Sequence, residues 1–207
     1  FFEMPTSDAR RILPDHLEPV EATHQRSILA VTAFHFTESV AGPYVELMFS
    51  VIVPPVPGRW RQRQHPKAGF YPFLAATSSD ESRRHRSEGF SIPYIADDID
   101  AQFVESAGTL RVSVWSHSGP IVDLTVTQHK WESTTHLLHT FMMDGNRRLK
   151  SNLQISGRYT MHENERGRMT LHHHPMTTAL TLDEISPYPF REHWLKDGVE
   201  LFHPLET

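Results

Sequence analysis

The chain has 207 residues, no cysteine, and a formal net charge of −5 at pH 7 with histidine counted as neutral. This length suits one β-rich domain, and the negative charge gives the chain no overall attraction for nucleic acid or an anionic membrane. Without cysteine, disulfides, thiolate metal sites and a cysteine nucleophile are excluded. The longest apolar runs are far shorter than the roughly 20 residues of a membrane-spanning helix. We therefore expect no nucleic-acid or membrane partner.

The first residues do not resemble a signal peptide, so we expect a cytoplasmic protein. The chain begins with Phe1 rather than methionine, which leaves open whether residues precede it.

The first half of the chain predicts two short helices and three strands. The first helix covers residues 7–13 and ends before Pro14. The second begins at Ser79 or Asp80 and runs to about Glu88. Alternating or continuous apolar residues predict strands over residues 27–36, 45–53 and 70–76. The proline-rich basic stretch 54–69 predicts a loop.

The second half predicts mainly strands. They are expected over residues 109–117, 121–128, 135–142, 149–161 and 169–173. A C-terminal tail from about 183 to 207 is rich in aromatic residues and proline. Within it we predict one short helix around residues 190–196. Many short strands with few helices favour an antiparallel barrel or sandwich. We expect a single domain over residues 1–207.

Glu46 is the first candidate for chemistry. In the strand 45–53, every second residue from Val45 is apolar, and Glu46 lies on the opposite face. In a one-sided sheet this face meets water, whereas in a covered barrel it lines a cavity. A carboxyl group in an apolar cavity has a raised pKa and can act as a general acid or base.

A second candidate is the run Arg83, Arg84, His85 and Arg86 in the second helix. One interpretation is a solvated basic segment. The other is that one or two arginines hold a carboxylate or enolate oxygen of a substrate, because the guanidinium group keeps its charge and binds oxyanions in a fork. Helical spacing lets no more than about half of the run face inward. Ser87 could add a hydrogen bond to a carbonyl group.

Histidines supply the remaining candidates. In a strand, His172 and His174 share a face, which suits a metal pair, a single acid–base residue at His174, or plain surface histidines. His117 shares a face with Trp115, and this face either lines a cavity or is exposed. No phosphate loop, dinucleotide fingerprint or serine-hydrolase motif is present.

Four stretches in the same order resemble the acetoacetate decarboxylase family. They are "SDARRILPDHLEP", "GPYVE", "SDESRRHRSEGFSIP" and "MTLHHHPMTTALTLDEI", and they span about residues 5 to 185. The resemblance implies a cone-shaped antiparallel β-barrel with short helices, a substrate inside the barrel, and a homo-oligomer. It also implies that Glu46, in the stretch with Tyr44, is an active-site glutamate, and that His174 belongs to the closing strand.

One departure from this family changes the expected chemistry. The family continues its Gly-Arg-Glu segment into Tyr-Pro-Lys-Lys, where one lysine forms a Schiff base with a β-keto acid and its neighbour lowers the pKa of that lysine. Here the two lysine positions fall on Ser87 and Glu88 in one register, and near Ser91 and Ile92 in another. Neither register supplies an amine, and a permanently protonated arginine is no substitute. A second family glutamate aligns near Val31 and is absent too.

The sequence therefore predicts a re-tasked enzyme of this type that performs non-covalent acid–base chemistry on a small carbonyl compound, without a cofactor or metal. Cyclisation, dehydration, isomerisation and carbon–carbon lyase action are all open. Glu46 would move the proton, Arg83 or Arg86 would stabilise negative charge, and His174 would position or donate. The expected substrate-binding residues are Arg83, Ser87, Tyr44, Trp115 and His117. The alternatives are a non-catalytic ligand carrier and a metalloenzyme that uses His172 and His174.

Overall fold

The computed structural model describes residues 1–55 and 68–206, and these residues are mainly strand. The strands are β1 (Phe2–Pro5), β2 (Glu21–Thr23), β3 (Arg26–Phe36), β4 (Tyr44–Val53), β5 (Gly69–Thr77), β6 (Ile99–Ser106), β7 (Thr109–Ser116), β8 (Gly119–Thr127), β9 (Glu132–Asp144), β10 (Arg147–His162), β11 (Arg168–Leu171) and β12 (Glu192–Phe202). The helices are α1 (Thr6–Ile12), α2 (Asp80–Phe90) and the 3-10 turns η1 (Pro175–Thr177) and η2 (Leu182–Glu184). Within the described part of the chain, no helix has the length and apolar character to cross a membrane.

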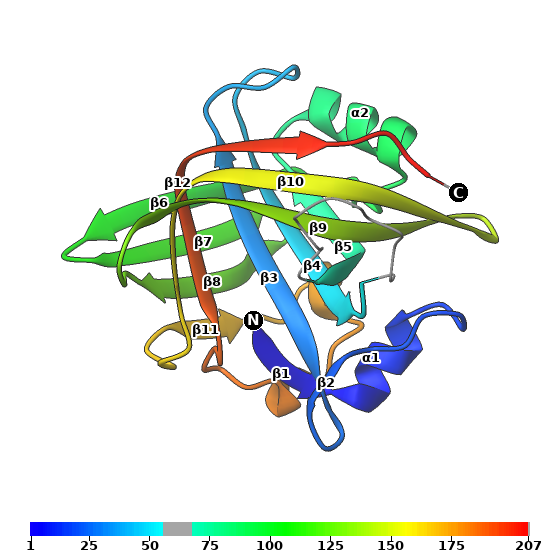
Figure 1. Cartoon of the computed structure of the whole chain (residues 1–207), viewed down its shortest axis with the longest axis horizontal. Helices are drawn as coiled ribbons and strands as arrows, with labels where there is room; N and C mark the ends of the chain where they lie inside the picture. Colours follow the sequence, from blue (N-terminus) through cyan, green and yellow to red (C-terminus); the bar gives the residue numbers. More distant parts are fainter. Residues whose placement is uncertain (56–67, 207) are drawn as a thin grey trace.

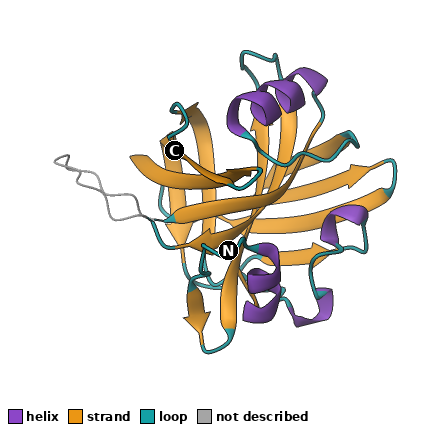
Figure 2. Ribbon diagram, turned by 90° about the vertical axis from the view of Figure 1, so that its right-hand side faces the viewer, coloured by secondary structure: helices purple, strands orange, loops and turns teal. Residues whose placement is uncertain are grey.

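The strands form two sheets. The larger has the order β1-β3-β4-β5-β9-β10-β12, with β2 paired to β3, and the smaller has the order β11-β8-β7-β6. Among the described strands, every pair is antiparallel except β5 with β9, which departs from the fully antiparallel expectation. The smaller sheet lies to one side of the larger, with the helices at the periphery (Figures 1 and 2). The pairing among described residues does not close either sheet on itself, and the arrangement is compatible with a cone-shaped barrel.

Strand β4 runs through the middle of the larger sheet and is buried on both faces. Leu47, Phe49 and Val51 are fully buried on one face, in a core that also takes Val112 and Val114 from the smaller sheet. The other face is covered as well, and Glu46 on it is only 1% exposed. The face of β4 that carries Glu46 is therefore covered by other residues and does not meet water.

Several predicted elements are confirmed, and one is wrong. Helix α2 begins as expected, with the Ser79 hydroxyl accepting a hydrogen bond from the Ser82 amide at 3.2 Å. The helix expected around 190–196 is instead the first half of β12, because this segment pairs with β10 and buries Trp194. Strands β1, β2 and β6 were not predicted from the sequence. Most of the predicted loop 54–69 lies outside the described residues.

A bulge shapes the pairing of β10 with β12. The register shifts between Ser156 and Arg158, and a side-chain carbon on Gly157 would lie 2.7 Å from the Cα of Gly198. Only glycine lets the two backbones approach this closely. Beyond the bulge, the last part of β12 continues along β10 and passes close to α2 (Figure 1). This path brings Glu200 to Arg86 of α2.

Candidate functional site

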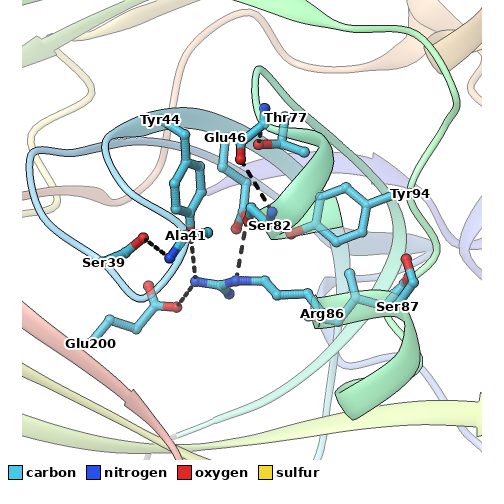
Figure 3. Close-up of polar contacts among 12 residues, drawn as sticks. Ser39, Ala41, Tyr44, Glu46, Thr77, Ser82, Arg86, Ser87, Tyr94 and Glu200 are labelled. Carbon is cyan, nitrogen blue, oxygen red and sulfur yellow. Dashed lines mark hydrogen bonds and ion pairs between the residues drawn. The ribbon is translucent and has the colours of Figure 1, made fainter. Parts of the chain in front are cut away.

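Three separated elements bring charged and phenolic side chains together around Arg86. Strand β4 supplies Tyr44 and Glu46, helix α2 supplies Arg86, and β12 supplies Glu200. Tyr94 comes from the segment after α2 (Figure 3). We call these five residues the Arg86 cluster.

The guanidinium group of Arg86 is the centre of the cluster. Its Nη2 donates to the Tyr44 hydroxyl at 3.0 Å and to Glu200 Oε1 at 2.9 Å. Its Nε lies 3.6 Å from Glu46 Oε2. The Arg86 side chain is 10% exposed and those of Glu46 and Glu200 are 0% and 7% exposed, so both ion pairs are shielded from water.

Aromatic rings surround this guanidinium group. Its central carbon lies 4.8 Å from the ring centroid of Phe202 and 5.5 Å from that of Phe36. Such contacts are favourable for a cation and give the cluster apolar walls. Low polarity strengthens every charge interaction inside it.

Tyr94 donates a short hydrogen bond to Glu46 Oε2. Its position is fixed by the neighbouring backbone, since the Ala75 amide donates to Pro93 O at 3.0 Å and the Ile95 amide donates to Ala75 O at 2.9 Å. The segment after α2 thus adds a short parallel bridge to β5. This bridge holds the phenol against the carboxyl group of Glu46.

Burial and charge shift the pKa values of the cluster. Burial raises the pKa of Glu46 to about 7; Arg86 opposes this shift, Glu200 adds to it, and the Tyr94 hydrogen bond opposes it. Burial also raises the pKa of Glu200, against the effect of Arg86. The pKa of Tyr94 is raised well above its usual range by burial and by Glu46. Burial lowers the pKa of Arg86, but the two carboxylates more than compensate, so it stays protonated. Glu46 is therefore able to gain or lose a proton near neutral pH.

Three buried polar atoms of the cluster have no hydrogen-bonding partner among the described residues. They are Glu46 Oε1, Arg86 Nη1 and Glu200 Oε2. Buried polar atoms in folded proteins are nearly always paired with protein, water or ligand. Two acceptor atoms and one donor atom of the cluster thus have hydrogen-bonding capacity that the described residues do not use.

The structure brings together three of the predicted site residues, namely Tyr44, Glu46 and Arg86. Arg83 points elsewhere and pairs with Asp80 and Asp98. Arg84 and His85 are exposed. The Ser87 hydroxyl donates to Ile92 O at 3.4 Å. Arg86 alone among the three arginines of the run is buried, in accord with the limit that helical spacing sets.

His174 is buried at a different place, where it caps η1. Its Nδ1 accepts from the Met176 amide at 3.1 Å, so in the neutral ring Nε2 carries the proton and donates to the Ser116 hydroxyl at 2.9 Å. Burial lowers the pKa of His174, which favours this neutral form. These bonds account for both ring nitrogens, and a catalytic role for His174 stays a prediction.

The other histidine and tryptophan candidates lie toward the surface. Trp115 is 38% exposed, and the side chain of His117 is 75% exposed. β11 ends at Leu171, so His172 and His174 do not share a strand face, and His172 pairs with Asp123 at 2.8 Å. Among the residues that the structure describes, no group of three or more His, Asp or Glu side chains is arranged to hold a metal ion.

Comparison with known proteins identifies the fold. No family model and no curated protein matches the sequence. Among solved structures, an acetoacetate decarboxylase matches with a TM-score of 0.63 and 15% identity, over 99% of this chain and 83% of the other. The enduracididine biosynthesis enzyme MppR in complex with pyruvate matches with a TM-score of 0.63 and 15% identity, over 99% and 84%. The acetoacetate decarboxylase of Legionella pneumophila matches with a TM-score of 0.61 and 15% identity, over 98% and 80%.

The chain has the acetoacetate decarboxylase fold.

Tyr94 and Glu200 of the cluster were not predicted from the sequence. Tyr94 could have been found from the acetoacetate decarboxylase motif, because matching Pro93 to the proline of Tyr-Pro-Lys-Lys places Tyr94 and Ile95 at the two lysine positions. This register supplies no amine either. Nothing in the sequence indicated Glu200 as a site residue, because its segment was expected to be a C-terminal tail.

The described lysines of this acetoacetate decarboxylase-like chain have partners outside the Arg86 cluster. Lys130 pairs with Glu132 at 3.1 Å, Lys150 pairs with Glu206 at 2.7 Å, and Lys196 pairs with Glu105 at 2.5 Å. Lys67 lies outside the described residues. The absence of a Schiff-base lysine stays a prediction, and a trapping experiment below tests it.

The raised pKa of Glu46 predicts how stability depends on pH. The folded state binds the carboxyl proton of Glu46 more tightly than the unfolded chain does. The resulting contribution to the free energy of unfolding is fully present below about pH 4.5 and is lost as the pH rises through about 7. The loss is on the order of 3 kcal/mol. Urea unfolding of the wild type and Glu46→Gln at about pH 5 and about pH 8 measures it. The free energy of unfolding should fall more steeply with pH in the wild type; parallel pH dependences would contradict the assignment.

Proposed function

We propose that this chain is an enzyme that performs non-covalent acid–base chemistry on a small carbonyl compound in the Arg86 cluster. The observation that carries the proposal is a fully buried carboxyl group, Glu46, whose pKa of about 7 lets it both take and return a proton. It lies beside a permanent cation and a phenol, the two groups that stabilise negative charge developing on an oxygen.

The proton transfer that these residues support is enolisation. Ionised Glu46 removes a proton from the carbon next to a carbonyl group, through the oxygen Oε1 that has no partner among the described residues. The C–H electron pair forms the C=C bond of the enolate, and the carbonyl π electrons move to its oxygen. Arg86 Nη1 donates a hydrogen bond to that oxygen. Glu46 then returns the proton, to the same carbon or to another atom of the substrate.

This single step is shared by isomerisation, dehydration, ring closure and carbon–carbon bond cleavage next to a carbonyl group. Solved structures with this fold include an acetoacetate decarboxylase and the enduracididine biosynthesis enzyme MppR with the condensation product of pyruvate and imidazole 4-carboxaldehyde. These examples support the assignment of a carbonyl substrate. We extend the proposal to a polyketide-like intermediate of a specialised biosynthetic pathway, which carries several enolisable carbonyl groups.

Proton exchange tests the proposal without knowledge of the final product. The wild-type protein is incubated in D2O with a panel of ketones, β-keto esters and keto acids, and loss of the α-proton signal is followed by NMR. We expect accelerated exchange for at least one class. Saturable binding without exchange across the panel would instead indicate a ligand carrier.

A second experiment tests the absence of a Schiff base. Borohydride is added to the protein with each exchanging compound, and the intact mass is measured. We expect no reduced adduct on the protein. Because borohydride also reduces the free ketone, exchange is measured again after the reagent is removed and fresh compound is added, and we expect the original rate. A covalent adduct on a lysine would contradict the non-covalent mechanism and would direct attention to Lys67 first.

A further inference from the structure

The guanidinium group of Arg86 already has two carboxyl groups of the protein beside it, one at each of two edges. Glu200 Oε1 lies 2.9 Å from Nη2, and Glu46 Oε2 lies 3.6 Å from Nε. Tyr44 shares Nη2 with Glu200. Only Nη1 is buried without a partner among the described residues. The arginine expected to hold a substrate carboxylate is thus largely occupied by carboxylates of the protein.

The charge of the cluster also disfavours an acid. With both glutamates ionised, two negative charges face one positive charge, and burial keeps water from screening the excess. An incoming carboxylate would place a third negative charge within a few ångströms of the first two. At such distances like charges repel strongly in a medium of low polarity. A neutral ligand avoids this cost.

The unpartnered atoms specify the hydrogen bonds that a ligand should make. Arg86 Nη1 needs an acceptor, whereas Glu46 Oε1 and Glu200 Oε2 need an O–H or N–H donor. The enol form of a β-dicarbonyl compound has both in one uncharged unit, a carbonyl oxygen and an enol O–H. The rings of Phe36 and Phe202 beside the guanidinium provide apolar contact for its carbon atoms.

We propose that Glu200 makes the Arg86 cluster select neutral, enolisable β-dicarbonyl compounds and reject the corresponding carboxylate acids. This inference rests on the proposed function, because it assigns the substrate class of the same site. In it Glu46 serves as the acid–base group and Glu200 is the specificity determinant. The re-tasking of the fold would then include a change of substrate charge as well as the loss of the amine.

A matched pair of ligands tests the selectivity by binding alone. Methyl acetoacetate and acetoacetate share one carbon skeleton and differ in whether the carboxyl group is a neutral ester or an anion. Dissociation constants are measured by calorimetry at about pH 8, where Glu46 is mostly ionised. We expect the wild type to bind the ester at least ~10-fold more tightly. Methyl butanoate, which lacks the second carbonyl group, should bind more weakly than methyl acetoacetate.

Glu200→Gln tests the cause of the selectivity. The amide keeps an oxygen for Arg86 Nη2 but removes one negative charge, so the preference for the ester should fall roughly tenfold. Glu105→Gln is the control, because it removes the same charge from an exposed ion pair with Lys196. The control should keep the wild-type preference. Circular dichroism verifies that both variants fold.

The outcomes separate this inference from the proposed function. Tighter binding of acetoacetate by the wild type, equal binding of the two ligands, or no binding of either overturns the selectivity, whatever Glu200→Gln does. An unchanged preference in folded Glu200→Gln overturns the role of Glu200. The expected preference without any α-proton exchange leaves the selectivity standing and removes only the proposed catalysis.

Discussion

Glu46→Gln is expected to lower the rate of α-proton exchange by ~10²–10⁴-fold, the range typical of a lost general base. Glutamine has nearly the same shape and keeps an oxygen for the Tyr94 hydroxyl, so the geometry of the cluster is retained. What is lost is a carboxyl group whose pKa burial brings to about 7. The measurement is the initial exchange rate by NMR at saturating ligand.

The pH profile adds a readout that a structural role would not change. In the wild type the exchange rate should rise with pH and level off above about 7, as Glu46 loses its proton. Glu206→Gln is the control, since this glutamate pairs with Lys150 and is not part of the Arg86 cluster. It should retain the wild-type rate and profile. A full exchange rate in Glu46→Gln would remove this residue from the mechanism.

Arg86→Met is expected to destabilise the folded protein by about 3–5 kcal/mol, because it leaves two buried carboxyl groups without a cation. Methionine fills much of the volume between Phe36 and Phe202, so the loss reports charge more than packing. The destabilisation should be greater at about pH 8 than at about pH 5, where protonation removes the uncompensated charge. Urea unfolding measures both values.

Arg83→Met on the same helix is the matched control. Its partners Asp80 and Asp98 are 86% and 67% exposed, and surface ion pairs of this kind contribute about 1 kcal/mol or less. Adding Glu46→Gln to Arg86→Met should recover part of the lost stability. Equal destabilisation by the two arginine variants would show that the Arg86 cluster is not a charge-balanced unit.

The sequence predicted the parts of this molecule that depend on local pattern. Alternation identified β3 and β4, and Ser79 marked the start of α2, because side-chain direction and capping act over a few residues. The identity of Glu46 and Arg86 as site candidates came from residue type together with a family resemblance. The fold inferred from that resemblance is confirmed by the structural comparisons.

Long-range pairing explains what the sequence did not predict. The segment around 190–196 resembles a helix locally, yet pairing with β10 makes it a strand. Glu200 meets Arg86 across 114 residues, and nothing near either residue signals the other. The direction of Arg83 depends on Asp98, which lies beyond the helix. Contacts within one chain do not test whether the protein forms a homo-oligomer, so this stays a prediction.

The bulge at Gly157 and Gly198 divides β12 into two halves, and the second half carries Glu200. Among described residues, β12 is paired on one side only, by β10. Terminal parts of edge strands open locally at a lower free energy than the sheet interior. Each such opening moves Glu200 away from Arg86, so that of the two carboxylates only Glu46 stays beside the guanidinium. The net charge of the cluster therefore changes when this part of β12 opens. Amide hydrogen exchange in Val199–Phe202 would thus report the free energy of this opening.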